Sequence, residues 1–316
     1  MLKLRHDRRG GRPIFAPVSV ATYRKQYAAH GKSLFLHPAW LDAVGGDSWR
    51  VAATRAHGLP YRRHRRWGST VLRHPPLTPF LEPLAYPTAA PSERVDWAAL
   101  LDALPPHARA HFLLGYDLDH WVPFYRRGWL VRPRYSYQLD LARSPAERLA
   151  AYKYSLRRTV KRAPTGLALC PLPLPGAYAR FEAHLRARGS GTGVRQAQFE
   201  QLHRTFAPTD ELQLWGLYRD ARLLASLCLA IDEGTAYCLL TERDERRDDV
   251  HAMHVLYHRV IEHCAAAGVH TFDFNGSMLP GVAAFNRAFG GRRRTKYELI
   301  HYGSRFWKAA SALRGR

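Results

Sequence analysis

The sequence of 316 residues is poor in acidic side chains, and this sets its overall charge. It has 26 Asp and Glu residues against 48 Lys and Arg residues, so the formal net charge is +22. A field of this sign attracts polyanions such as nucleic acid, acidic lipid or phosphate-bearing cofactors. The alternative is a generically basic surface. Arginine predominates over lysine, which favours planar binding of phosphate or carboxylate, although a GC-rich genome gives the same bias.

Cysteine is scarce. It occurs four times, at Cys170, Cys228, Cys238 and Cys264, without C-x-x-C spacing, and this excludes the common zinc patterns. We expect buried free thiols. In a cytosolic setting Cys228 and Cys238 would stay reduced even where a hairpin brings them face to face.

Long apolar runs are absent. No segment approaches the roughly eighteen apolar residues of a membrane span, and the basic segment 1–12 is not followed by the apolar core of a signal peptide. We therefore expect a cytoplasmic protein, for which peripheral contact with a membrane surface is the remaining membrane role. A phosphate-loop fingerprint is missing too, because G-S-G-T-G at 189–193 separates two helical segments, and we interpret it as a flexible linker.

The segment 270–291, H-T-F-D-F-N-G-S-M-L-P-G-V-A-A-F-N-R-A-F-G-G, combines a strand, a polar turn and a helix. Alternation in the strand places Asp273 on the face opposite to Phe272 and Phe274. The N-G-S sequence that follows breaks the strand. A proline then suits the first turn of a helix, which two glycines end.

This turn has two interpretations. Ligands in α/β sheets bind beyond the carboxyl ends of strands, where loop amides and a helix N-terminus can hold anions. Ordinary turns are also made of Asp, Asn, Gly and Ser, in which case Asp273 only caps the turn.

A helix that begins with a capping box at 144–147 and ends before Pro164 carries a basic segment at 153–162. That segment has no acidic residue, and cations four positions apart form two like-charged rows that repel unless an anion relieves them. The members of these rows are Arg157, Arg158, Lys161 and Arg162. This segment is our leading candidate for anion binding, and a solvated basic face is the alternative.

The segment Tyr61–Trp67, Y-R-R-H-R-R-W, mixes cations with aromatic rings. Such a composition can bind phosphates while it stacks bases or sugars. The segment is short, and a solvated hairpin decorated with arginines is the preferred interpretation.

His251, His254 and His258 have spacings that can bring imidazoles to one metal ion. No carboxylate or fourth ligand is evident near them, and they lie away from the apolar face of their helix. We therefore expect no metal site.

Several segments together resemble the Fem-like (FemAB-related) branch of the GNAT acyltransferase superfamily. The segment 272–291 is similar to its closing segment, with D-F-x-G-S, P-G-V and F-G-G in order. The other similar segments are the basic helix at 155–163, the central hairpin at 223–241, F-L-H-P-A-W at 35–40 and P-P-L-T-P-F-L-E-P at 75–83. The resemblance spans about residues 33 to 302.

This resemblance implies an α/β (α+β) fold of tandem GNAT-like (acyl-CoA N-acyltransferase) domains, with mixed, mostly antiparallel sheets flanked by helices. The expected parts are a basic, partly disordered lead at 1–32, a first domain at 33–142, a second domain at 143–303 and a basic C-terminal tail at 304–316.

The function implied is transfer of an acyl group from an activated donor, acyl-CoA or similar, to the amine of a small molecule or peptide. The donor is then a co-substrate, and no tightly bound cofactor is expected. The alternative is an aminoacyl-tRNA donor, with tRNA as a partner and a peptidoglycan precursor or peptide as the acceptor. A second alternative is a non-catalytic protein that binds nucleic acid or another polyanion on the same scaffold.

Two features concern the donor: the first departs from GNAT acyltransferases in general but is usual in the Fem-like branch, and the second departs from the relatives that use charged tRNA. The segment 243–249, R-D-E-R-R-D-D, has no glycine for a phosphate-holding turn, and its aspartates near a helix start oppose a phosphate. Asn286 follows Phe285 where relatives that use charged tRNA carry lysine. Neighbouring cations at 287, 292–294 and 296 would have to supply the missing charge.

The candidate site residues follow from this placement. Asp273 is the candidate base or amine-orienting carboxylate, and Asn275 and Ser277 are positioning or oxyanion groups. The candidates for donor or anion binding are Arg157, Arg158, Lys161, Arg162 and Lys296. The candidates for substrate binding are Phe274, Gly276, Phe285 and Asn286.

Overall fold

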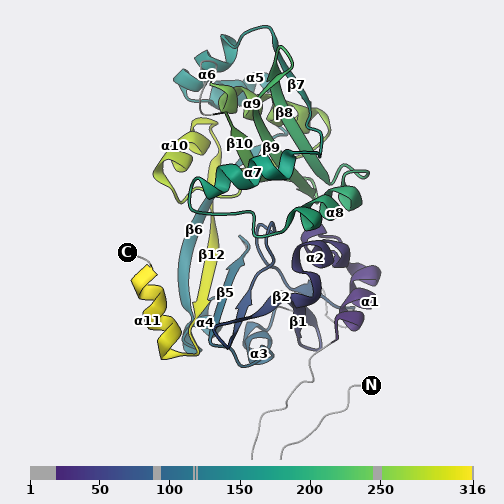
Figure 1. Cartoon of the computed structure of the whole chain (residues 1–316), viewed down its shortest axis with the longest axis vertical. Helices are drawn as coiled ribbons and strands as arrows, with labels where there is room; N and C mark the ends of the chain where they lie inside the picture. The colour runs from purple at the N-terminus through teal and green to yellow at the C-terminus, as the bar shows by residue number, and fades with distance from the viewer. Residues whose placement is uncertain (1–18, 88–93, 117, 119, 245–250, 315–316) are drawn as a thin grey trace, which may run out of the picture. The chain divides into compact units, whose positions relative to one another are not determined.

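The computed structural model describes residues 19–87, 94–116, 118, 120–244 and 251–314, which form two compact units (Figure 1). Unit 1 comprises Met1–Pro133 with Lys296–Arg316, and unit 2 comprises Arg134–Thr295. The chain passes from one unit to the other within two strands, β6 (Leu130–Asp140) and β12 (Arg292–His301). The domain ends expected from the resemblance, at residues 142 and 303, follow the ends of β6 and β12, whereas the division into compact units falls inside both strands.

Unit 1 is built on a mixed sheet with the strand order β1-β2-β3-β5-β12, in which β4 pairs with β2. Its other strands are β1 (Trp49–Ala53), β2 (His57–Arg66), β3 (Ser69–Arg73), β4 (Leu84–Ala85) and β5 (Arg109–Leu114). Its helices are α1 (Val20–His30), η1 (Leu34–Leu36), α2 (Pro38–Gly45), η2 (Gly46–Ser48), α3 (Trp97–Asp102), α4 (Val122–Arg126) and α11 (Arg305–Arg314).

Two terminal segments of unit 1 are more ordered than the sequence indicated. Helix α1 lies inside the predicted lead, and its Tyr23 is buried and donates a hydrogen bond to the carbonyl oxygen of Leu36 at 2.9 Å. Residues 1–18 of that lead lie outside the described residues. The predicted C-terminal tail forms α11, in which Trp307 is buried. Aromatic anchors explain both differences, since burying such a ring contributes about 1.5–3 kcal/mol.

Unit 2 is built on a mixed sheet with the order β6-β11-β10-β9-β8-β7. Its other strands are β7 (Leu167–Pro171), β8 (Leu212–Arg219), β9 (Arg222–Asp232), β10 (Thr235–Arg243) and β11 (Thr271–Asp273). Its helices are α5 (Pro145–Ala151), α6 (Tyr154–Lys161), α7 (Ala177–Arg186), α8 (Gln196–Phe206), α9 (Ala252–Ala266) and α10 (Pro280–Ala288). The hairpin expected at 223–241 is present as β9 and β10, and the strand, turn and helix predicted within 270–291 are confirmed by β11 and α10.

The helix predicted between residues 144 and 164 is divided into α5 and α6. The capping box is present, because the Ser144 side chain accepts from the amide of Glu147 and the Glu147 carboxylate accepts from the amide of Ser144. Tyr152 has extended backbone angles, and the amide of Lys153 donates to the carbonyl oxygen of Ala288 at 2.7 Å. The long-range hydrogen bond therefore replaces the one that would continue the helix.

The G-S-G-T-G segment is held in place and is not a free linker. The carboxylate of Glu182 accepts hydrogen bonds from the Thr192 amide at 2.9 Å and from its hydroxyl at 2.8 Å. Thr192 is buried, and Gly189 has the left-handed φ of +73° that ends α7. These bonds lower the pKa of Glu182 to about 2, chiefly through the Thr192 amide.

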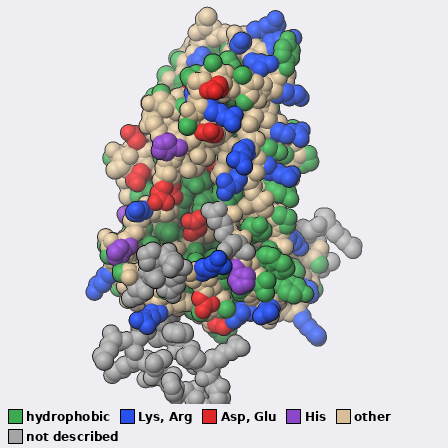
Figure 2. Space-filling view, turned by 180° about the vertical axis from the view of Figure 1, so that it is seen from behind, with side chains coloured by type: hydrophobic (Ala, Val, Ile, Leu, Met, Phe, Trp, Pro, Cys, Tyr) green, Lys and Arg blue, Asp and Glu red, His purple; other side chains and the backbone are tan. Residues whose placement is uncertain are grey.

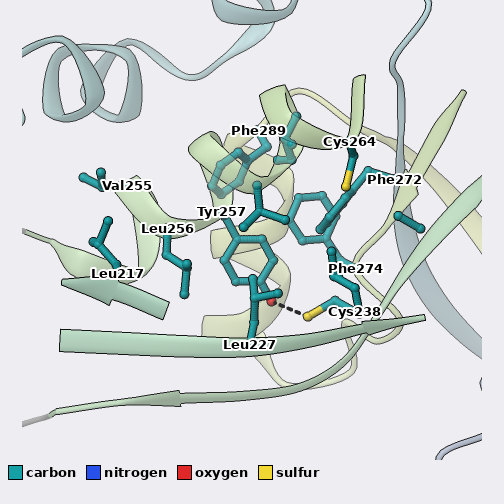
Figure 3. Packing of buried hydrophobic residues seen from close by; sticks show 14 of the residues in the cluster. Leu217, Leu227, Cys238, Val255, Leu256, Tyr257, Cys264, Phe272, Phe274 and Phe289 are labelled. Carbon is teal, nitrogen blue, oxygen red and sulfur yellow. Dashed lines mark hydrogen bonds between the residues drawn. The ribbon is translucent and has the colours of Figure 1, made fainter. Parts of the chain in front are cut away.

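The core of unit 2 lies between the sheet and α9 and is rich in aromatic rings (Figure 3). Phe272 and Phe274 pack against Tyr257 there, while Asp273 between them faces away, as the alternation predicted. The hydroxyl of Tyr257 lies 3.1 Å from the sulfur of Cys238. The four cysteines are free, and all but Cys170 are buried.

The architecture is the predicted mixed α/β fold with mostly antiparallel sheets. Among the described pairings, β3 with β5 and β10 with β11 are parallel strand pairs. None of the described helices has the length and apolar character needed to span a bilayer. Lys and Arg side chains are widely distributed over the face in Figure 2, as the composition indicates.

Candidate active site

The candidate site begins where two strands of unit 2 separate. Strands β10 and β11 pair in parallel over three residue pairs, the last of which is Tyr237 with Asp273. β11 ends there, whereas β10 continues to Arg243. The register of β10 against β9 shifts between Cys238 and Leu240. Such a bulge places one extra residue, Leu239, on β10 between two registered pairs.

Asp273, at the end of β11, is surrounded by hydrogen-bond donors. Its carboxylate accepts from the Ser136 hydroxyl at 2.6 Å, from the Gln138 side-chain amide at 2.9 Å and from the Asn275 backbone amide at 2.7 Å. The side chain is 0 % exposed. A buried carboxylate needs such donors to offset its desolvation. Asp273 therefore ties β6, β11 and the following turn together.

Ser136 and Gln138 were not among the predicted site residues. Both lie on β6, and Gln138 is the register partner of Asp273. The sequence contains half of the signal, because the alternation of 135–141 places these two polar side chains on one face. It contains no sign of the pairing between β6 and β11, which joins residues more than 130 positions apart.

The turn after Asp273 is fixed from the side of α10. The Asn286 side-chain amide donates to the Gly276 carbonyl oxygen and to the Ser277 hydroxyl, both at 2.8 Å, and that hydroxyl donates to the same carbonyl at 2.7 Å. Asn275 has a φ of +55°, which asparagine tolerates better than most residues. Apart from Gly276 itself and its two chain neighbours, no atom of the described residues lies within 4 Å of the position that a Cβ on Gly276 would occupy. The turn is thus rigid on one side and open on the other.

The predicted substrate-binding residues divide into two groups. Gly276 lies at the open side of the turn, whereas Asn286 is 2 % exposed and holds the turn. Phe274 is buried and stacks on Tyr257 with ring centroids 5.4 Å apart. Phe285 packs on the His254 ring at 4.7 Å. Substrate contact by these rings stays a prediction, and the contacts described here belong to the core.

The basic helix α6 contacts the far end of α10. Besides the bond from Lys153 to Ala288, the glycine pair after α10 permits a close approach, because a Cβ on Gly290 would lie 2.5 Å from the carbonyl oxygen of Ala151. Gly290 also has a left-handed φ of +79°. The close approach to Ala151 and the left-handed backbone therefore explain the glycine at position 290 of the F-G-G motif. Helix α10 begins at the polar turn and ends at the start of the basic helix.

The predicted anion-binding residues of α6 are brought together on one short helix. Arg158, Lys161 and Arg162 are exposed. Among the described residues, no carboxylate lies within ion-pair distance of these three cations. Arg157 is half-buried and donates to the carbonyl oxygen of Ala150 at 2.9 Å. Their binding of an anion stays a prediction.

Lys296, the fifth predicted anion-binding residue, belongs to unit 1. It is 3 % exposed, and its ammonium lies 5.3 Å from the Phe80 ring centroid and 5.1 Å from that of Tyr116. It also donates to the carbonyl oxygen of Pro79 at 3.4 Å. These contacts are those of a buried cation that stabilises its own unit.

A metal site has no support in the described part of the chain, where no group of three or more His, Cys, Asp or Glu side chains could hold an ion. His258 instead lies 3.2 Å from the Tyr152 hydroxyl, and His254 stacks on Phe285. Residues 245–250, which include most of the glycine-free segment before α9, lie outside the described residues.

A cavity of about 290 Å³ in unit 2 lies at the other end of β11. It is lined by Asp140, Thr271, Arg148 and Arg292, among others. The Arg148 guanidinium is already paired with Glu262. This cavity borders Gln138 but not the polar turn, so we do not assign the chemistry to it.

Comparison with known proteins identifies a domain match within the chain and similar solved structures. Residues 135–287 match the family described as the acetyltransferase (GNAT) domain. No curated protein matches the sequence. The fold is similar to that of FemX, with a TM-score of 0.61 and 12% identity over 90% of this chain and 96% of that one. It is also similar to the C-terminal domain of a putative lysylphosphatidylglycerol synthetase from Agrobacterium fabrum, with a TM-score of 0.59 and 14% identity over 92% and 94% of the two chains.

A third similar structure is that of L-PGS from Bacillus licheniformis, with a TM-score of 0.57 and 10% identity over 93% of this chain and 94% of that one. At these identities the likeness concerns the fold. The domain match covers the strands, the turn and most of α10 described above. Residues 135–287 are therefore similar in sequence to a GNAT domain, and the fold of the whole chain is similar to that of FemX.

Proposed function

We propose that the chain is an N-acyltransferase, which moves an acyl group from an activated ester or thioester to an amine. One observation carries this proposal. A rigid polar turn, 275–277, directly follows the point at which β10 and β11 separate, inside a GNAT domain. The end of β11 and the β10 bulge lie next to this turn, which has space beside Gly276.

The reaction needs no covalent enzyme intermediate. The amine attacks the donor carbonyl directly, so the protein has to position the two reactants and stabilise the developing oxyanion. The proposed oxyanion donor is the backbone amide of Leu239, the residue that the β10 bulge leaves outside the ladder. The amine is proposed to enter on the open side of the turn at Gly276.

Asp273 and Asn286 act as positioning residues in this proposal. The three donors that Asp273 accepts from and its complete burial leave it without access to a substrate amine. Asn286 holds the same turn from α10. Asp273 and Asn286 therefore affect the reaction by holding the turn in place, and the substrate does not have to contact either side chain.

The activated donor is proposed to be anionic and to be held by α6. Helix α10 has 9 residues, so about 13 Å of helix separates the polar turn from the start of α6. A donor that reaches both places is extended, with its phosphates at Arg158, Lys161 and Arg162 and its carbonyl near the turn. Acyl-CoA and aminoacyl-tRNA both have this general form.

An aminoacyl-tRNA donor is the second candidate, and the exposed cations of α6 favour it specifically. Three cations without a carboxylate among the described residues suit a row of linked phosphates. Two of the similar structures are titled FemX and putative lysylphosphatidylglycerol synthetase, which supports this candidate by fold alone. Asn286 in place of a lysine opposes it, because the buried amide supplies no charge.

The test is a donor screen with the purified full chain. Panels of acyl-CoA and aminoacyl-tRNA donors are incubated with primary amines, and acylated products are found by mass spectrometry. Lys161→Glu should weaken use of the donor, and Arg204→Glu, an equal charge change on the exposed face of α8, should not. Salt-steep binding of polyanions with no product from any donor would favour the non-catalytic alternative.

A further inference from the structure

Unit 1 contains a second basic region, on one face of its sheet. In the register of β2, β3 and β5, Arg62 lies opposite Arg73, and Arg109 lies beside Val71. Residues paired across strands, and those two apart along a strand, share a face. Arg73 and Arg109 therefore lie on the same face. The opposite face carries Leu72, Ala110 and Phe112, which are buried in the unit's core.

A cavity of about 590 Å³ opens on this basic face. Its volume falls in the range of about 300–1,000 Å³ that is usual for small-molecule sites. The cationic side chains that line it are Arg66, Arg73, Arg109, Arg132 and Lys308. Glu298 is the one acidic residue among its lining residues, and its carboxylate lies 2.9 Å from the His111 ring. One carboxylate therefore faces five cations.

Aromatic rings form the other part of the wall. Trp67 and Trp307 lie with ring centroids 4.9 Å apart, and Trp67 is 53 % exposed. The Arg66 guanidinium lies 4.7 Å from the Trp67 ring centroid, and that of Arg109 lies 5.8 Å from the Tyr302 ring. Flat rings beside guanidinium groups offer stacking surfaces for a base.

Several donors in this wall have no acceptor among the described residues. The indole N–H of Trp307 is buried and unbonded, and so are the Nε–H groups of Arg73 and Arg109. Burial lowers the pKa of Arg73, and the charges of Arg109, Arg66 and Arg62 lower it further. Like charges held together in a partly buried site cost stability unless an anion neutralises them.

From these observations we infer that the cavity binds a nucleotide, whose phosphates pair with Arg73 and Arg109 and whose base stacks on the Trp67–Trp307 wall. Guanidinium groups bind phosphate oxygens bidentately, and this accounts for arginine in place of lysine at these half-buried positions. The Y-R-R-H-R-R-W segment, interpreted above as a solvated hairpin, supplies Arg66 and Trp67 to this wall. The site lies in unit 1 and uses no residue of the proposed transfer site in unit 2.

The experiment measures binding of ADP to the full chain by titration calorimetry and by the rise in melting temperature. Arg109→Gln and Lys308→Gln should each weaken ADP binding at least tenfold. Arg63→Gln should leave the affinity unchanged, because Arg63 is on the same strand as Arg66 but on the other face, opposite Leu72. Lys308 is exposed on α11, so its variant keeps the test valid even if Arg109→Gln perturbs folding.

Further measurements show which part of the ligand is bound and which unit binds it. Inorganic pyrophosphate and adenosine should each bind at least tenfold more weakly than ADP, because each lacks one half of the ligand. Lys161→Glu in unit 2 should not change ADP affinity. The inference is overturned if the wild-type chain does not bind ADP, if pyrophosphate binds as tightly as ADP, or if Arg63→Gln or Lys161→Glu weakens binding as much as Lys308→Gln does.

Discussion

Replacing Asp273 by asparagine separates a positioning carboxylate from a catalytic base. The substitution keeps the shape of the side chain and removes its charge. An asparagine oxygen can still accept from the Ser136 hydroxyl and the Asn275 amide, which both contact the same oxygen, Oδ1. Its amide nitrogen would then face the side-chain amide of Gln138, donor against donor, until Gln138 turns over.

The expected loss of stability follows from these contacts. Weakening two charge-assisted hydrogen bonds and disturbing a third costs about 1–3 kcal/mol. In a domain of this size 1 kcal/mol shifts the melting temperature by about 2–4 °C, so Asp273→Asn should lower it by roughly 2–12 °C. Asp273→Ala leaves the buried Ser136 hydroxyl and the half-buried donors of Gln138 and Asn275 without their acceptor and should cost about 3–5 kcal/mol. Thermal unfolding followed by circular dichroism measures both.

The transfer rate provides the decisive assay. If Asp273 positions the turn, Asp273→Asn slows transfer without changing the shape of the pH–rate profile. Ser136→Ala serves as the matched control, because it removes one donor to the same carboxylate and should leave that profile in place too. A loss of about 10²–10⁴-fold in rate together with loss of the acid limb would show general-base catalysis and refute the positioning role.

Three other predictions test parts of the structure that support the site. Glu182→Gln should destabilise the chain at neutral pH but not in acid. Folding lowers the pKa of Glu182 to about 2. The contribution of this carboxylate to stability is therefore complete above its unfolded pKa of about 4.3 and is lost as the pH falls towards 2. Urea unfolding of both proteins at pH 7 and pH 3 should show the difference shrinking, and an equal difference at both pH values would contradict this. Gly290→Ala should cost more than about 1–2 kcal/mol, since its Cβ would lie 2.5 Å from a backbone oxygen at a positive φ; an unchanged melting temperature would show that α5 and α10 can move apart. Lys161→Glu should weaken donor binding and reduce its salt dependence, whereas Arg204→Glu should do neither; equal effects would make the binding non-specific.

Local sequence patterns predicted the elements of the site well and their partners poorly. The alternation around Asp273 and the proline and glycine signals of α10 have periods of two and 3.6 residues, so a short window is sufficient to identify them. The donors Ser136 and Gln138 lie on a strand more than 130 positions before Asp273 in the sequence. The β10 bulge has no characteristic amino-acid composition by which it could be predicted. The hydrogen-bond partners of Asp273 and the position of the bulge both depend on the pairing of strands, which a short window of sequence does not show.

The predicted anion-binding set shows the same limit. Arg158 and Lys161 lie on α6 and Arg162 is its C-cap residue, a grouping that their spacing in the sequence predicts. Lys296 was grouped with them because it is close in sequence to α10. Lys296 is the residue of β12 at which the chain enters unit 1, and its ammonium lies near two aromatic rings of that unit. Two residues that are close in the sequence can therefore belong to different units.

The donor screen tests the central claim most directly, because it asks whether the chain transfers an acyl group at all. Mass spectrometry should find an acylated amine with at least one acyl-CoA or aminoacyl-tRNA donor, and Asn286→Ala, which releases the Gly276 carbonyl and the Ser277 hydroxyl, should slow that transfer. The absence of any product from both donor classes, in a chain that is folded and binds polyanions, would contradict the assignment of acyl transfer to this site.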